Sequence, residues 1–135
     1  MKLEEIAKNY MSIWNSGNQD KLDDFAVKNL KVDYPHFETL IQGTENYKKL
    51  LKQSYFYFPD IRINLTEIIS NELTNVITVF WNYQGTHKNG EIFGLDSTGK
   101  KVKVEGITVL DVHDGLVKIE RGIIDNMSLM IQLKS

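Results

Sequence analysis

The stretch that decides the fold is residues 76–125, VITVFWNYQGTHKNGEIFGLDSTGKKVKVEGITVLDVHDGLVKIERGIID. It contains three runs rich in β-branched and aromatic residues, which favour strands: residues 76–87, 102–112 and 116–125. His113-Asp114-Gly115, between the last two runs, predicts a tight hairpin. A further strand is expected at residues 61–69, so this half of the chain predicts an antiparallel meander.

The first half of the chain predicts three helices. The first has apolar residues at helical intervals, namely Leu3, Ile6, Ala7, Tyr10 and Trp14. It should end near Gly17, a residue typical of helix C-termini. A shorter helix is expected at residues 20–26, and a third should begin at Thr44 and stop before Pro59. Two short extended runs, residues 30–34 and 37–41, flank Pro35-His36.

Helices followed by an antiparallel meander are typical of an α+β fold. We therefore expect three N-terminal helices packed on a strongly curved antiparallel sheet, with a central cavity at the open end of the curve. The long strands contain Gly85, Gly106 and Gly122. Glycines inside strands often mark bends or bulges, which supports the expected curvature.

The composition indicates an ordinary soluble domain. The length of 135 residues predicts one domain over residues 1–135. The formal net charge is −2, so no basic surface for nucleic acid is expected. The absence of cysteine excludes disulfides and thiol catalysis. No signal peptide and no membrane-spanning run are recognised, and a cytoplasmic location is the expectation.

Asp125 is the most informative single residue. If the last strand alternates regularly, Asp125 shares a mostly apolar face with Val117, Ile119, Arg121 and Ile123. A carboxylate on such a face is costly unless it is paired or hydrogen-bonded, and burial moves its pKa toward values useful in proton transfer. The alternatives are a strand-end aspartate that caps a turn and an ion pair with Arg121.

Several motifs in order give the chain a resemblance to a known family. The motifs are Gly43 before the third helix, Phe58-Pro59-Asp60, Gly85-Thr86-His87, Thr98-Gly99-Lys100, Asp114-Gly115, Asp125 and the tail Leu129-Met130-Ile131-Gln132-Leu133. From about Leu3 to Leu133 the chain resembles the SnoaL-like polyketide cyclases. That resemblance implies the cystatin-like cone, or α+β barrel, shared with nuclear transport factor two and the ketosteroid isomerases.

The resemblance also implies a chemistry. Members of the family close a ring by intramolecular aldol condensation without a metal or cofactor. The matching aspartate here, Asp125, would be the acid/base, and the His87 position would face the ligand. Family members often carry tryptophan four residues before the aspartate, where this chain has Arg121. An arginine there would keep Asp125 ionised, form a salt bridge, or bind an anionic substrate.

The remaining candidates are predicted to contact the ligand. In a regular strand, Trp81, Tyr83 and His87 share one face, and His87 could donate or carry a proton. Residues expected to bind substrate are Tyr10, Trp14, Tyr55, Trp81, Tyr83, Glu105 and Arg121. Each also has a purely structural interpretation: core packing for the aromatic residues, a solvent-exposed or turn-bonded position for His87 and an exposed position for Glu105. The three histidines are too widely separated in the sequence to predict a metal site.

We therefore expect an enzyme that needs no cofactor and acts by acid/base chemistry on a small apolar or anionic carbonyl compound. The reaction would be an aldol-type cyclisation or an isomerisation. A ketosteroid-isomerase-like base is less favoured, because Tyr34 occupies that base's position and Asp33 lies one residue away. Other hypotheses are a non-catalytic small-molecule-binding domain and an interaction domain. A homodimer is expected from the resemblance alone.

Overall fold

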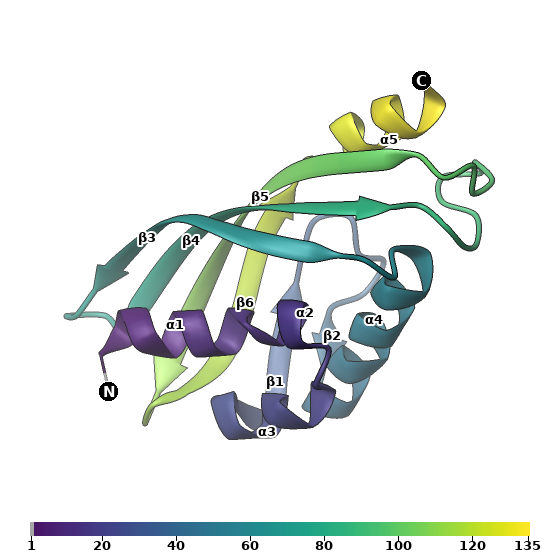
Figure 1. Cartoon of the computed structure of the whole chain (residues 1–135). Coiled ribbons are helices and arrows are strands. Elements are labelled where there is room, and N and C mark those ends of the chain that lie inside the picture. Colours follow the sequence, from purple (N-terminus) through teal and green to yellow (C-terminus); the bar gives the residue numbers. More distant parts are fainter. Residues whose placement is uncertain (1) are drawn as a thin grey trace.

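The computed structural model describes residues 2–135 as an α+β fold (Figure 1). The helical elements are α1 (Leu3–Met11), α2 (Ile13–Ser16), the short 3-10 helix η1 (Gln19–Lys21), α3 (Leu22–Phe25), α4 (Thr44–Tyr57) and α5 (Asn126–Lys134). The strands are β1 (Ala26–Asp33), β2 (Ile41–Gln42), β3 (Arg62–Asn71), β4 (Val76–Thr86), β5 (Lys101–His113) and β6 (Leu116–Ile124).

The six strands form one curved sheet in the order β2-β1-β6-β5-β4-β3. Figure 1 shows the sheet arching over the N-terminal helices and α4, with α5 beside β5. The prediction of an α+β fold with helices on a curved sheet is confirmed. The prediction of a purely antiparallel sheet is wrong, because β1 pairs with β6 in parallel and makes the sheet mixed. The sheet is open, so it is not a closed barrel.

The expected helices and strands are present, with differences at four places. The first helix breaks at Ser12 into α1 and α2 and ends at Gly17, whose φ of 68° suits glycine. The second helix is split between η1 and α3. Of the extended run predicted at residues 37–41, only its last residue belongs to β2. The tail after Asp125 is the helix α5, which the sequence analysis did not predict.

The strand glycines lie where aromatic rings pass close to the backbone. A Cβ atom at Gly106 would meet the Trp81 indole at 2.3 Å. A Cβ at Gly122 would lie 2.2 Å from the Ile107 carbonyl oxygen and 2.7 Å from the Tyr34 ring. These contacts need a residue without a side chain. The two glycines therefore let the Trp81 and Tyr34 rings come close to the backbone of the sheet.

Gly122→Ala should lower the free energy of unfolding by about 1–3 kcal/mol, because the new methyl group displaces the Ile107 backbone or the Tyr34 ring. Urea unfolding measures the loss. The control is Arg121→Ala at the adjacent exposed position, where a change within about 0.5 kcal/mol is expected. Equal stability of the two variants would contradict this account of Gly122.

Candidate functional site

A buried carboxylate, that of Glu120 on β6, is the centre of the site. Its side chain is only 3% exposed. Three tyrosine hydroxyls donate hydrogen bonds to it: Tyr10 at 2.6 Å and Tyr47 at 2.8 Å to Oε1, and Tyr34 at 2.5 Å to Oε2. Buried carboxylates need such donors because they have lost their water. The three hydroxyls therefore make the burial of Glu120 possible.

The three tyrosines come from separate parts of the chain. Tyr10 lies on α1, Tyr34 directly follows β1, and Tyr47 lies on α4. All three are at most 5% exposed. The carboxylate of Glu120 on β6 therefore connects three other parts of the chain: α1, the segment after β1, and α4. Its position can be known only when these elements are assembled.

A second layer of donors orients the hydroxyls. The indole N–H of Trp14 donates to the Tyr47 hydroxyl at 3.2 Å, which leaves the Tyr47 hydrogen free to point at Glu120. The indole N–H of Trp81 donates to Thr108 Oγ1 at 2.8 Å, and Thr108 Oγ1 lies 2.7 Å from the Tyr34 hydroxyl. Both chains of hydrogen bonds end at the carboxylate, an arrangement that favours its ionised form.

Burial shifts the ionisation of the whole cluster. Desolvation raises the pKa of Glu120 above its ordinary value, and the hydrogen bonds from the three tyrosines act in the opposite direction. Desolvation also raises the pKa of Tyr10, Tyr34 and Tyr47 well above the usual range, and the nearby Glu120 charge adds to that effect. The hydroxyls thus stay protonated as donors. Glu120 is the group in the cluster that can exchange a proton.

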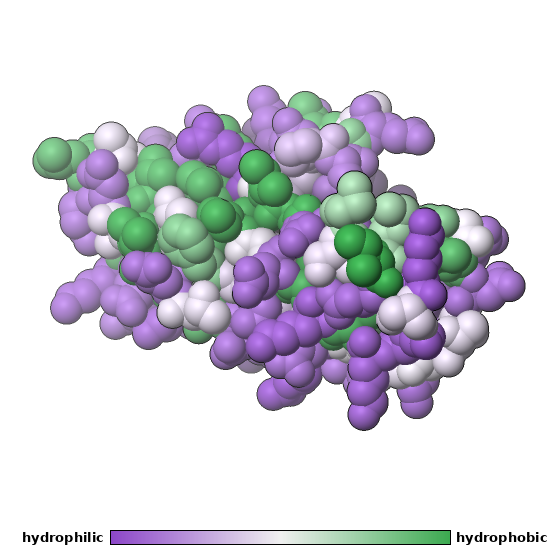
Figure 2. All heavy atoms as spheres, turned by 90° about the horizontal axis from the view of Figure 1, so that it is seen from above, coloured by the Kyte–Doolittle hydropathy of each residue, from purple (hydrophilic) through white to green (hydrophobic). Residues whose placement is uncertain are grey.

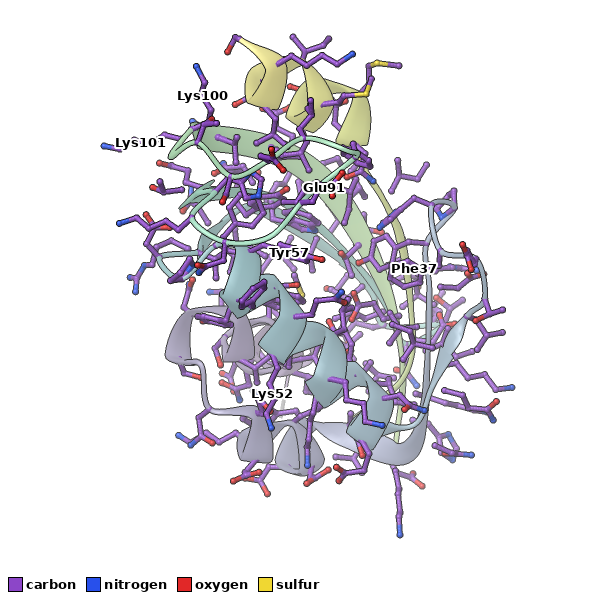
Figure 3. The ribbon with its side chains drawn as sticks, turned by 90° about the vertical axis from the view of Figure 1, so that its right-hand side faces the viewer. Phe37, Lys52, Tyr57, Glu91, Lys100 and Lys101 are labelled. Carbon is purple, nitrogen blue, oxygen red and sulfur yellow. The ribbon has the colours of Figure 1, made fainter. Side chains whose placement is uncertain are left out.

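Glu120 lies at a cavity of about 400 Å³, within the range of small-molecule sites. The cavity is lined mainly by apolar and aromatic side chains, including Trp14, Phe37, Tyr57, Phe58, Trp81 and Tyr83. Tyr34, Tyr47 and Thr108 contribute their hydroxyl groups to the same wall. Figure 3 shows Phe37, Tyr57 and Glu91, three of the lining residues, approaching the cavity from three different segments.

One acceptor position of the carboxylate is left for a ligand. A carboxylate has about four lone-pair positions. Among residues 2–135, hydrogen bonds occupy three of them, two on Oε1 and one on Oε2. Since Glu120 also lines the cavity, its Oε2 can accept a proton or a hydrogen bond from a bound molecule.

A β-bulge decides which carboxylate of β6 faces the interior. Asp111 of β5 pairs with Ile119, but the next residue, Val112, pairs with Val117, so Lys118 is an extra residue. Val117 is buried before the bulge, and regular alternation would bury Ile123 and expose Glu120 after it. The structure shows the reverse: Glu120 is buried and Ile123 is 65% exposed. The prediction that Asp125 shares the buried face of Val117 is therefore wrong. The bulge moves that face to Glu120.

Asp125 instead caps the helix α5. Its Oδ1 accepts a hydrogen bond from the backbone N–H of Ser128 at 3.0 Å, and the residue is exposed. Within the described residues 2–135, no ion pair joins it to Arg121, which is also exposed. Asp125 and Glu105 line a more open groove of about 800 Å³ on the outer side of the sheet and are not among the residues lining the cavity at Glu120. A catalytic role for Asp125 stays a prediction.

His87 is held in a turn. It is 1% exposed, and its Nε2 lies 2.7 Å from the carbonyl oxygen of Gly90. Its ring packs against the rings of Phe58 and Tyr57. His87 is not among the lining residues of the cavity at Glu120. The structure thus matches the turn-bonded alternative for this histidine, and its catalytic role is untested.

The predicted aromatic residues divide into three groups. Trp14, Trp81 and Tyr83 line the cavity, and the last two rings stack 6.2 Å apart. Tyr10 lies behind the cavity wall and supports Glu120. The Tyr55 hydroxyl donates to the backbone carbonyl of Trp14 and holds α4 to α2. The expected common face of Trp81 and Tyr83 is therefore present.

The sequence analysis missed Glu120 and Tyr47, and it predicted Tyr10 as a ligand contact and not as a donor to a buried carboxylate. The available signal was the tyrosines themselves, since Tyr10 and Tyr47 lie on predicted apolar helix faces and buried tyrosine hydroxyls need partners. Regular alternation placed Glu120 on the polar face of its strand, which concealed the acceptor. Within residues 2–135, no three His, Cys, Asp or Glu side chains gather as a candidate metal-binding group, and no helix is long and apolar enough to cross a membrane.

The fold is an α+β cone that encloses a polar cluster beside an apolar cavity. The family model of the SnoaL-like polyketide cyclases matches residues 4–133, and the chain belongs to that family. No curated protein matches the chain in sequence.

Solved structures show the same fold at low sequence identity. IdmH of Streptomyces antibioticus, described provisionally as a polyketide cyclase, has a TM-score of 0.85 and 18% identity, and the match covers 100% of both chains. A provisionally assigned polyketide cyclase of Acidithiobacillus ferrooxidans has a TM-score of 0.84 and 22% identity over 99% of this chain and 95% of that one. AclR of Streptomyces galilaeus, described provisionally as a hydroxylase, has a TM-score of 0.82 and 17% identity over 98% and 95%.

The raised pKa of Glu120 predicts a specific pH dependence of stability. Because the folded state binds this proton more tightly than the unfolded state, Glu120 contributes most below its ordinary pKa of 4.5. That contribution is lost as the pH rises through the folded pKa. Urea unfolding from about pH 4 to pH 8 should show that the wild-type protein loses stability relative to Glu120→Gln as the pH rises. Asp125→Asn is the control, and a Glu120→Gln difference that does not vary with pH would contradict the prediction.

Proposed function

We propose that the chain is a cofactor-independent enzyme that performs acid/base chemistry on a small apolar carbonyl compound, as an aldol-type cyclisation or an isomerisation. The observation that carries this proposal is the buried Glu120 carboxylate, which lines an apolar cavity and receives only one hydrogen bond on Oε2. A buried carboxylate with a raised pKa is suited to remove a proton next to a carbonyl group.

The proposed step transfers one proton. The substrate's C–H bond breaks, the proton goes to Glu120 Oε2, and the electron pair moves to the carbonyl oxygen as an enolate. The hydroxyls of Tyr34 and Thr108 line the same wall, but each has one hydrogen, and in the folded protein these point at Glu120 and at Tyr34. Donation to the enolate oxygen therefore requires one of these hydrogens to turn toward the substrate. The enolate can then attack a second carbonyl group in an aldol closure or take the proton back at another carbon in an isomerisation.

A simple ketone tests proton abstraction without knowledge of the natural substrate. The probe is 2-tetralone in D2O, whose exchange of α-hydrogen for deuterium is followed by NMR. The wild-type protein should accelerate exchange above the buffer rate, and Glu120→Gln should reduce the acceleration by about 100-fold or more, the usual contribution of a general base. Asp125→Asn is the matched carboxylate variant and should retain the acceleration within about twofold.

Each outcome of this comparison has a meaning. Loss of exchange in Asp125→Asn and its retention in Glu120→Gln would transfer the role to Asp125, the residue to which the family resemblance assigns it. No acceleration by the wild-type protein would favour the alternative of a non-catalytic small-molecule-binding domain in the same cavity. His87→Gln tests the second predicted residue in the same assay.

We also propose that the chain forms a homodimer through the outer face of its sheet. Apolar side chains gather there (Figure 2), and Ile107, Ile123 and Met127 are 40%, 65% and 64% exposed around one groove. Exposed apolar patches of this kind often mark protein–protein contacts.

Light scattering after size exclusion should give about twice the mass of one chain for the wild-type protein, and about one chain mass for Ile123→Lys, because a charge in a buried apolar contact is unfavourable. Leu73→Lys is the control, since Leu73 is 96% exposed on the β3–β4 hairpin and is not among the groove residues. A monomeric wild-type protein would contradict the dimer.

A further inference from the structure

The charged residues that line the cavity are all acidic. Glu120 forms part of its inner wall, and Glu91 lies at its exposed edge. No lysine or arginine is among the lining residues of the described chain. His36 also lines the cavity, but desolvation lowers its pKa, which favours the neutral ring at neutral pH. Figure 3 shows Lys100 and Lys101 pointing outward, away from Phe37 and Glu91.

The buried carboxylate has no counter-ion within the described chain. Its partners are three neutral hydroxyls, and none of the ion pairs formed by residues 2–135 includes Glu120. Neutral donors stabilise a buried ion only partly, because they do not cancel its charge. A positive charge placed at Oε2 would meet an uncompensated negative charge in surroundings of low polarity, where attraction is strong.

The walls next to the carboxylate also suit a cation. The rings of Tyr34, Tyr47 and Trp14 adjoin Glu120 directly or through one hydrogen bond, and the stacked pair Trp81 and Tyr83 completes the aromatic lining. Aromatic faces attract organic cations through their quadrupole, and the attraction grows when water is excluded. The same walls bind the apolar body of a ligand.

We infer that this cavity binds an organic cation, a protonated amine carried on an apolar body, with its ammonium group at Glu120 Oε2 and its body against the aromatic walls. The inference goes beyond the proposed function, because pairing with Oε2 does not require that a proton be removed. It also argues against an anionic ligand, one of the alternatives expected from the sequence, since the Arg121 side chain that would bind an anion lies at an exposed position.

A matched ligand series tests the charge preference on the unmodified protein. Benzylammonium, benzyl alcohol and benzoate have the same ring and differ in charge at pH 7. Quenching of Trp14 and Trp81 fluorescence, confirmed by calorimetry, measures the three dissociation constants. We expect benzylammonium to bind about tenfold or more tightly than benzyl alcohol, and benzoate to bind more weakly than the alcohol. Equal or tighter binding of the alcohol, or no binding of benzylammonium, would overturn the inference.

Two variants then test which carboxylate causes the tighter binding of benzylammonium. Glu120→Gln should reduce benzylammonium affinity about tenfold while leaving benzyl alcohol within about twofold. Glu91→Gln removes a charge of the same sign at the exposed edge and should change both affinities little, because solvent screens it. An equal loss in both variants would overturn the assignment to Oε2. The two proposals can fail separately, because 2-tetralone is uncharged. If the protein accelerates hydrogen–deuterium exchange of 2-tetralone but does not prefer benzylammonium to benzyl alcohol, this inference is refuted and the proposed enzyme is not.

Discussion

The burial of the Glu120 carboxylate is the constraint on which the rest of the structure depends. An ion removed from water must receive hydrogen bonds from the protein, and here α1, α4 and the segment after β1 each supply one tyrosine hydroxyl. The helices therefore meet the sheet at a fixed distance, set by three bonds between 2.5 and 2.8 Å. Apolar packing alone would leave that spacing less well defined.

The same constraint explains why the interior is hollow. The tyrosine and tryptophan side chains that serve the carboxylate are large and rigid, and they reach Glu120 from α1, α2, α4 and the segment after β1. They cannot also fill the space in front of it, so a cavity of about 400 Å³ is left between them. Gly106 and Gly122 belong to this arrangement, because Trp81 and Tyr34 occupy the space that their side chains would take.

The chain shares a closely similar fold with solved structures of low sequence identity. IdmH shares 18% of its residues with this chain at a TM-score of 0.85. A similarity at that level concerns the backbone and says nothing of which side chains act. The chemistry of this chain must therefore be argued from its own cavity, where a carboxylate and neutral hydroxyls face an apolar space.

Much of the fold could be predicted from local patterns. The spacing of Leu3, Ile6 and Tyr10 predicts α1, Gly17 predicts its end, and the β-branched runs predict β3 to β6 within a few residues. These signals are local, since helix and strand periodicities depend on near neighbours in the chain. The parallel pairing of β1 with β6 could not be predicted in this way, because its partners are about 90 residues apart.

The site was decided by the tertiary structure. The sequence by itself identified the aromatic residues Trp14, Trp81 and Tyr83, which line the cavity, and predicted a buried carboxylate near the end of the chain at Asp125. It could not identify which carboxylate is buried, because the extra residue Lys118 reverses the alternation of β6. As a result the side chain of Glu120 is buried and that of Asp125 is exposed. A bulge depends on the pairing of two assembled strands, so the buried acid and its three tyrosines are defined only in the folded molecule.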